Sequence, residues 1–164
     1  METYNLRKFV YFSIILLVFT FSGNIFAENS YEKKARKQYN DGLTFQEKGK
    51  IKNAIIKYEI AKRIDPSLYE PYYQLGKIYV NEKNYDKAEK LFKTVTELKP
   101  NLYLGHLELG HLYFETKQYN YAKNALEKAL ELESNNFGVY YYLGNIYLVS
   151  ERKRTFYKSA GMIC

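Results

Sequence analysis

Small and apolar residues recur along residues 35–150 with a period of 34. Residues of the same kind stand in each column of this repeat, in the first half of the unit and again in the second half. The columns are Gly42, Gly76, Gly110 and Gly144; Leu75, Leu109 and Leu143; Phe45, Tyr79, Tyr113 and Tyr147; Ala54, Ala88 and Ala122; and Tyr58, Phe92 and Leu126. So many columns at one spacing predict a structural unit that is repeated about three and a half times.

Within each unit the apolar positions predict two helices. In the second unit they fall at residues 75, 78 and 79 and, after a polar turn, at residues 88, 91, 92, 95 and 98. This three-and-four spacing places them on one face of each helix. Pro66 and Pro100 end the second helix of their units, because proline cannot continue a helix, and Ser134 to Asn136 stand at the matching place in the third.

The spacing and a set of residues of the second unit together resemble the tetratricopeptide repeat, a 34-residue helix-turn-helix unit. These residues are Leu75, Gly76, Tyr79, Ala88, Phe92, Val95 and Pro100. The resemblance implies an all-α fold, an α-solenoid of antiparallel helix pairs forming a right-handed superhelix. We expect a lead-in at 28–34, repeats at 35–68, 69–102 and 103–136, and the first helix of a partial fourth repeat at 137–150, which caps the array. Asp41, in the leucine column, and Gln38 and His106, where an aromatic residue is usual, depart from the pattern.

The closing segment, 151–164, is basic and out of register with the repeat. Lys153 stands where the earlier units have Tyr85 and Tyr119, and Phe156 stands where they have alanine. Two interpretations remain open. The segment is a solubilising tail after a capping helix, or it marks a longer array that was cut short by truncation or a change of reading frame.

The first 27 residues have the order of a secretory signal peptide. Arg7 and Lys8 precede an apolar run at 9–21, and small residues lead to Ala27. The alternative is an uncleaved anchor, because the 19 residues from 9 to 27 are long enough to span a bilayer. The chain is therefore expected to be exported, periplasmic or secreted, or to associate with a membrane through 9–27 with its repeats outside the cytoplasm.

Resemblance to the family implies a concave groove lined by the first helix of each unit. The residues expected to line it are Tyr39, Leu43, Tyr73, Lys77, Leu107, His111, Tyr141 and Asn145. Tyrosine offers a large apolar body with a polar tip, which suits a peptide-binding surface. Some family members clamp a C-terminal carboxylate with lysines and asparagines, but here only Lys77 and Asn145 fit that role. We therefore expect an adaptor or scaffold whose groove binds an extended apolar peptide or an amphipathic helix of a protein partner. The structural alternative is that each of these side chains simply packs between helices.

The remaining residues indicate no chemistry. Cys164 is the single cysteine, and His106 and His111 are five residues apart, so they do not share a helix face as a zinc pair would. No phosphate-binding or nucleophile motif is present, so we expect no enzyme, cofactor, metal site or small-molecule substrate. The net charge of +7 and the basic clusters at 32–37, 48–52 and 151–158 leave a second function class open, attachment to anionic lipid or envelope polymer. A structural subunit of an envelope complex is a further alternative, and export disfavours nucleic acid as a partner.

Overall fold

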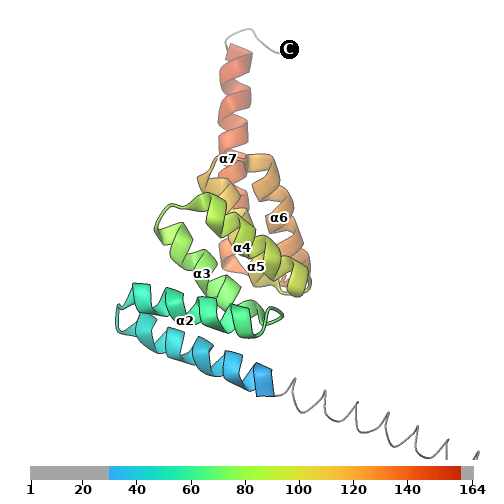
Figure 1. Cartoon of the computed structure of the whole chain (residues 1–164). Helices are drawn as coiled ribbons and strands as arrows, with labels where there is room; N and C mark the ends of the chain where they lie inside the picture. The colour runs from blue at the N-terminus through green and yellow to red at the C-terminus, as the bar shows by residue number, and fades with distance from the viewer. Residues whose placement is uncertain (1–29, 160–164) are drawn as a thin grey trace, which may run out of the picture. The chain divides into compact units, whose positions relative to one another are not determined.

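The computed structural model of the chain describes residues 30–159, with side chains through residue 155. These residues form seven helices and no strand, so the prediction of an all-α fold is confirmed for this range. The helices are residues 30–47, α2 (Ile51–Ile64), α3 (Tyr69–Asn81), α4 (Tyr85–Leu98), α5 (Tyr103–Glu115), α6 (Tyr119–Leu132) and α7 (Phe137–Ser159) (Figure 1). The predicted signal segment, 1–27, lies outside the described residues. No helix within them is both long enough and apolar enough to cross a membrane.

The chain divides into two compact units, residues 1–66 and 67–164. In unit 1 the helix of residues 30–47 pairs with α2 through the fully buried side chains of Ala35, Ala54, Tyr58 and Ala61. The Tyr58 hydroxyl donates a hydrogen bond to Oε1 of Gln46 at 2.8 Å. Burial raises the pKa of Tyr58 to about 12, so this hydroxyl remains a proton donor at neutral pH.

Unit 1 compensates for Asp41, its departure from the leucine column. The ammonium group of Lys57 lies 3.3 Å from Oδ2 of Asp41 and donates a hydrogen bond to Oε1 of Gln38 at 2.9 Å. Lys57 stands 34 residues before Leu91, which is buried in the second repeat. The salt bridge between Lys57 and Asp41 therefore stands where the second repeat has Leu91 and Leu75. Because Lys57 also bonds Gln38, this one lysine explains why both polar residues are tolerated in unit 1.

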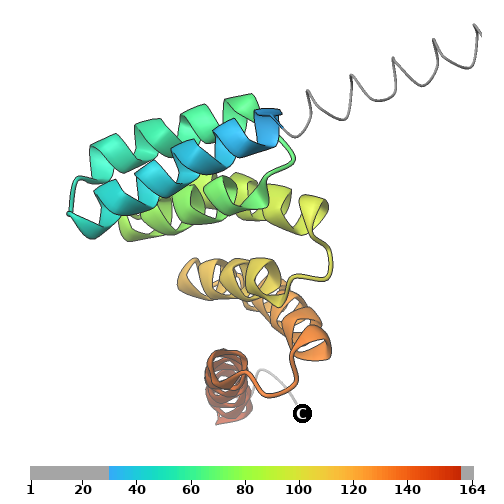
Figure 2. The ribbon, with the colours of Figure 1, turned by 90° about the horizontal axis from the view of Figure 1, so that it is seen from below.

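Unit 2 contains the antiparallel pairs α3 with α4 and α5 with α6, and α7 packs against both α5 and α6 (Figure 2). Its core consists of the predicted columns together with residues from α7. The members are Ala88, Phe92, Leu109, Leu112, Tyr113, Ala122, Leu126, Ala129, Val139, Leu143 and Ile146. Packing of successive helix pairs in this way buries a continuous apolar face that no single pair could bury alone.

The glycine column marks the closest approach of the two helices in each complete repeat. A Cβ atom on Gly76 would lie 2.5 Å from Cε1 of Phe92, and one on Gly110 would lie 2.5 Å from Cγ of Leu126. Gly42 approaches the ring of Tyr58 in the same way within unit 1. Glycine therefore allows the two helices to approach closely at these three positions. At Gly144, by contrast, nothing lies within 4 Å of such a Cβ atom.

The turn inside each complete repeat uses one residue in the left-handed conformation. Gly49, Lys83 and Lys117 have φ values of 68°, 58° and 59° and stand 34 residues apart. In the second repeat the amide of Asn84 donates to the carbonyl of Tyr79 at 2.8 Å, and the amide of Lys83 donates to that of Val80 at 2.9 Å. These two bonds form a Schellman motif, which satisfies carbonyls at the helix end.

The fourth unit lacks this turn. We expected its first helix to end near residue 150, but α7 continues to Ser159, and in Figure 1 its C-terminal part extends past the other helices of unit 2. The residue in the turn column is Glu151, which has a good helix propensity and forms a salt bridge with Arg154 at 3.4 Å within α7. Neither glycine nor proline occurs between residues 145 and 159, so nothing in the sequence stops the helix.

Lys83→Gly should stabilise the chain. A non-glycine residue in the left-handed region costs roughly 1–2 kcal/mol, and glycine removes this cost while adding chain entropy to the unfolded state. We expect a net gain of about 1 kcal/mol, which raises the melting temperature by about 4–8 °C for a unit of this size. Thermal unfolding followed by circular dichroism measures it. A lower melting temperature than that of the wild type would show that the lysine side chain makes contacts that outweigh its backbone cost.

Candidate functional site

The eight residues predicted to line a groove lie on the first helix of each repeat. Tyr39 and Leu43 lie on the helix of residues 30–47 in unit 1, where the Tyr39 ring is 5.8 Å from that of Tyr58. The other six lie in unit 2, on α3, α5 and α7: Tyr73, Lys77, Leu107, His111, Tyr141 and Asn145. Contacts between side chains connect these three helices.

Tyr73 connects α3 with α5. Its hydroxyl donates a hydrogen bond to Oε1 of Glu108 at 3.0 Å, and its ring lies 6.2 Å from the ring of Phe92. Burial, with the neighbouring Glu108 carboxylate as the next cause, raises the pKa of Tyr73, so the phenol remains a donor. Lys77 lies over the same ring, with its ammonium 5.5 Å from the ring centroid. Tyr73 therefore packs between helices and is also partly exposed at the surface.

His111 connects α5 with α7. Its ring stacks on that of Tyr142 with centroids 4.9 Å apart. Two carboxylates flank it: Oε2 of Glu108 lies 3.9 Å from Nδ1, and Oε1 of Glu115 lies 3.7 Å from Nε2. The Tyr141 ring meets the Tyr142 ring edge-on at 5.2 Å. Burial, followed by the Glu115 and Glu108 carboxylates, raises the pKa of Tyr142.

We call the resulting patch the first-helix surface. It consists of Tyr73, Lys77, Glu108, His111, Glu115, Tyr141 and Tyr142. It combines three phenol rings and an imidazole with two carboxylates and one ammonium group. Tyr141 has the most exposed ring among its tyrosines, at 61%.

Two of the predicted residues have local roles in the structure. Leu107 is partly buried against the core of unit 2. Asn145 donates its side-chain amide to the backbone carbonyl of Tyr141 at 2.8 Å, within α7. The structural alternative, packing between helices, thus describes Leu107 well, whereas Tyr141 remains available at the surface.

Glu108, Glu115 and Tyr142 are not among the residues predicted from the sequence. Glu108, His111 and Glu115 are spaced three and four residues apart, so they share one face of α5. Tyr142 follows Tyr141 directly and points at that face from α7, as its stacking on His111 shows. These residues lie outside the two columns from which the groove was predicted, whereas the three-and-four spacing along α5 is a sequence signal that includes both glutamates.

Within the described residues, no group of three or more His, Cys, Asp or Glu side chains could hold a metal ion. The polar contacts of the first-helix surface are hydrogen bonds and ion pairs between neighbouring helices. Their geometry offers flat aromatic faces and carboxylate edges to a ligand of extended shape. Such a surface can bind side chains.

Comparison with known proteins identifies the repeats. The family model described as "Tetratricopeptide repeat" matches residues 69–102, and the one described as "TPR repeat" matches residues 110–148. A comparison with curated protein sequences finds no match.

Solved structures share the fold. The first TPR of Spaghetti (RPAP3), bound to the HSP90 peptide SRMEEVD, is 24% identical over 73% of this chain and 95% of its own, with a TM-score of 0.70. The Sgt2 TPR domain from Aspergillus fumigatus is 22% identical over 74% of this chain and 82% of its own, with a TM-score of 0.67. The second TPR domain of human RPAP3, in complex with the HSP70 peptide SGPTIEEVD, is 22% identical over 71% of this chain and 98% of its own, with a TM-score of 0.66.

The family matches cover most of unit 2, and the fold of the solved structures extends the similarity to about three quarters of the chain. The expected solenoid of helix pairs is thereby confirmed. Residues 69–102 and 110–148 are therefore tetratricopeptide repeats.

Proposed function

We propose that this chain is a protein-interaction adaptor that binds a peptide or helix of a partner on its first-helix surface. The observation that carries the proposal is the exposed ring of Tyr141 beside the stacked pair of His111 and Tyr142. Similar solved TPR domains are bound to peptides of HSP90 and HSP70, which supports a peptide as the ligand. Tyrosine rings that are already held by neighbours lose little freedom on binding, so they favour affinity.

The charge of the first-helix surface supports a different peptide class from that of these relatives. Their peptides end in the acidic sequence EEVD. Here Glu108 and Glu115 place two carboxylates beside His111, and Lys77 is the one lysine of the surface. An acidic tail would meet like charge, which costs affinity and selects against such a partner. We propose that the partner peptide is apolar or aromatic and carries basic rather than acidic side chains.

We further propose that this binding takes place outside the cytoplasm or at a membrane. The support is the order of basic, apolar and small residues in the first 27 positions of the sequence. Fractionation of the native cell, with N-terminal sequencing of the recovered chain, tests this. A mature N-terminus at Glu28 supports export with cleavage, and an intact Met1 in the membrane fraction supports an anchor. An intact chain found in the cytosol would contradict both.

Site-specific photocrosslinking in the native cell tests the binding surface. A photoreactive residue at position 141 should form an adduct with a protein partner, because Tyr141 is exposed on the first-helix surface. Position 121 on α6 provides the matched control, since Tyr121 has a similar exposure, 63%, but belongs to a second helix. Adducts from position 121 and none from position 141 would overturn the assignment.

A further inference from the structure

Two glutamates of the first-helix surface share one histidine as their charged neighbour. Oε2 of Glu108 lies 3.9 Å from Nδ1 of His111, and Oε1 of Glu115 lies 3.7 Å from Nε2. Among the described residues, neither carboxylate forms an ion pair with a lysine or an arginine. The charge of this part of the surface therefore depends on whether His111 is protonated.

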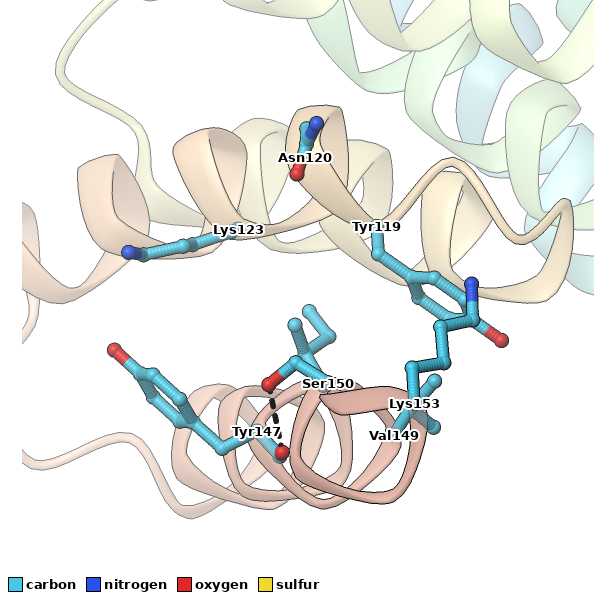
Figure 3. Close-up of a pocket in the computed structure, with 8 residues that line it drawn as sticks. Tyr119, Asn120, Lys123, Tyr147, Val149, Ser150 and Lys153 are labelled. Atoms are coloured by element: carbon cyan, nitrogen blue, oxygen red, sulfur yellow. Dashed lines mark hydrogen bonds between the residues drawn. The ribbon is translucent and has the colours of Figure 1, made fainter. Parts of the chain in front are cut away.

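Other charged sites of unit 2 are built from lysine instead. A pocket of about 340 Å³ lies between α6 and α7 (Figure 3), and its charged lining residues are Lys123 and Lys153. On α4, the ammonium group of Lys93 lies 2.7 Å from Oε1 of Glu89. Lysine stays charged through the neutral range, whereas histidine changes its charge between about pH 5 and 8. The first-helix surface is thus the site whose charge changes in this range.

His111 is placed to exchange protons with the solvent. Its side chain is 28% exposed, and its ring is held by stacking on Tyr142 of α7 with an interplanar angle of 24°. A neutral imidazole has an N–H on one nitrogen, whereas an imidazolium has one on each. The protonated ring can therefore direct a donor toward Glu108 and another toward Glu115, and it places a positive charge between the two carboxylates.

The other titratable groups around His111 keep their charge between about pH 5 and 8. Tyr142 stacks on it, Tyr141 meets Tyr142 edge-on, and Tyr73 on α3 bonds one of the two carboxylates. Burial raises the pKa of Tyr73 and of Tyr142, so both phenols stay uncharged. The two carboxylates and the ammonium group of Lys77 give the surface a net charge of −1 while the imidazole is neutral, and protonation brings the total to zero.

We infer that His111 makes partner binding on the first-helix surface sensitive to pH: the surface holds a basic side chain of the partner when the imidazole is neutral and releases it when the imidazole is protonated. This inference rests on the proposed function, which gives the partner peptide basic side chains. Glu115, which is 44% exposed, offers the carboxylate that such a side chain can reach. In acid, the same side chain meets the added positive charge of His111, which lowers its affinity.

A purely structural role for His111 would have a different signature. Protonation would then change the packing of α5 against α7 and would alter the affinity for basic and acidic peptides in the same direction. The electrostatic role requires opposite directions, because the imidazolium repels a basic peptide and attracts an acidic one.

Two capped peptides test the inference on the full chain. The acidic peptide has the sequence SRMEEVD, and the basic peptide, SRMKKVF, has lysine, lysine and phenylalanine in place of its acidic residues. Binding is followed by fluorescence anisotropy of the labelled peptide at about pH 5.5 and about pH 7.5, on either side of the ordinary pKa of histidine. The variants are His111→Gln, His111→Lys and Glu115→Gln. His106→Gln is the matched control, because His106 is the other histidine of the chain and its Nε2 lies 3.0 Å from the carbonyl oxygen of Pro100.

The basic peptide should bind the wild type about fivefold more weakly at the lower pH, which is the effect of one unit charge at about 4 Å in water. The acidic peptide should bind more tightly there, and His106→Gln should behave like the wild type. His111→Gln should bind the basic peptide equally at both pH values, and His111→Lys should bind it weakly at both. Glu115→Gln should weaken the basic peptide at the higher pH without disturbing the stacking of His111 on Tyr142.

The outcomes separate the inference from the proposed function. A dependence on pH that persists in His111→Gln, is absent from the wild type or has the same sign for both peptides would overturn the inference while leaving the binding of a basic peptide in place. A wild type that binds neither peptide, or that prefers SRMEEVD at the higher pH, would overturn the proposed preference for a basic partner and the inference with it.

Discussion

Gly76→Ala should lower the free energy of unfolding by about 1–3 kcal/mol. The added Cβ atom would lie 2.5 Å from Cε1 of Phe92, which is fully buried and has no room to move aside. The loss should appear even though alanine is the better helix former by about 1 kcal/mol. Urea unfolding of the full chain followed by circular dichroism measures it.

Gly144→Ala is the matched control, because it is in the same column of the repeat. Nothing lies within 4 Å of the added Cβ atom there, so helix propensity decides and the variant should gain about 0.5–1 kcal/mol. Opposite signs at two equivalent positions would show that close packing, and not the helical backbone, requires glycine. Equal effects at Gly76 and Gly144 would contradict the packing described for unit 2.

Tyr73→Ala combined with Tyr141→Ala should abolish capture of the partner identified by crosslinking. The two changes remove aromatic faces at two ends of the first-helix surface, and aromatic anchors of this kind often cost 2 kcal/mol or more of binding energy, roughly a thirtyfold loss of affinity. Titration of the partner with the purified wild type and variant measures the loss.

The structure shows that this double variant needs controls. Tyr73 packs on Phe92 and bonds Glu108, so its removal also affects stability, whereas Tyr141 is 61% exposed. Tyr141→Ala alone should therefore lose most of the affinity while keeping the wild-type melting temperature. Tyr121→Ala, on α6, should bind like the wild type. If Tyr121→Ala and Tyr141→Ala weaken binding equally, the tyrosines of the first-helix surface have no special role.

The helix pairs could be predicted because each column of the repeat has one packing role. Gly76 and Phe92 illustrate this: they are 16 residues apart, and the same separation recurs in Gly110 and Leu126. The polar residues between the two helices of each unit likewise lie in turns, at residues 48–50, 82–84 and 116–118. Periodic features of this sort need only spacing and residue type.

Features that depend on a particular neighbour could not be predicted in this way. The helix α7 continues through Glu151. To predict this, one would have to weigh the helix propensity of that single residue against the turn that the same column forms in the other repeats. The salt bridge between Lys57 and Asp41 joins two residues that are 16 apart in the sequence, and both depart from the apolar columns of the repeat. His111 on α5 stacks on Tyr142 of α7, and two glutamates flank it. This arrangement depends on how the two helices pack, so it could be identified only from the structure.

Chemical-shift mapping tests the central claim most directly, because it reports where on the full chain a partner peptide binds. The probe is a synthetic peptide spanning the partner segment that crosslinks to position 141. We expect the largest amide shifts on α3, α5 and α7, around Tyr73, His111 and Tyr141, and small shifts on α4 and α6. Shifts concentrated on α4 and α6 instead, with the first-helix surface unchanged, would contradict it.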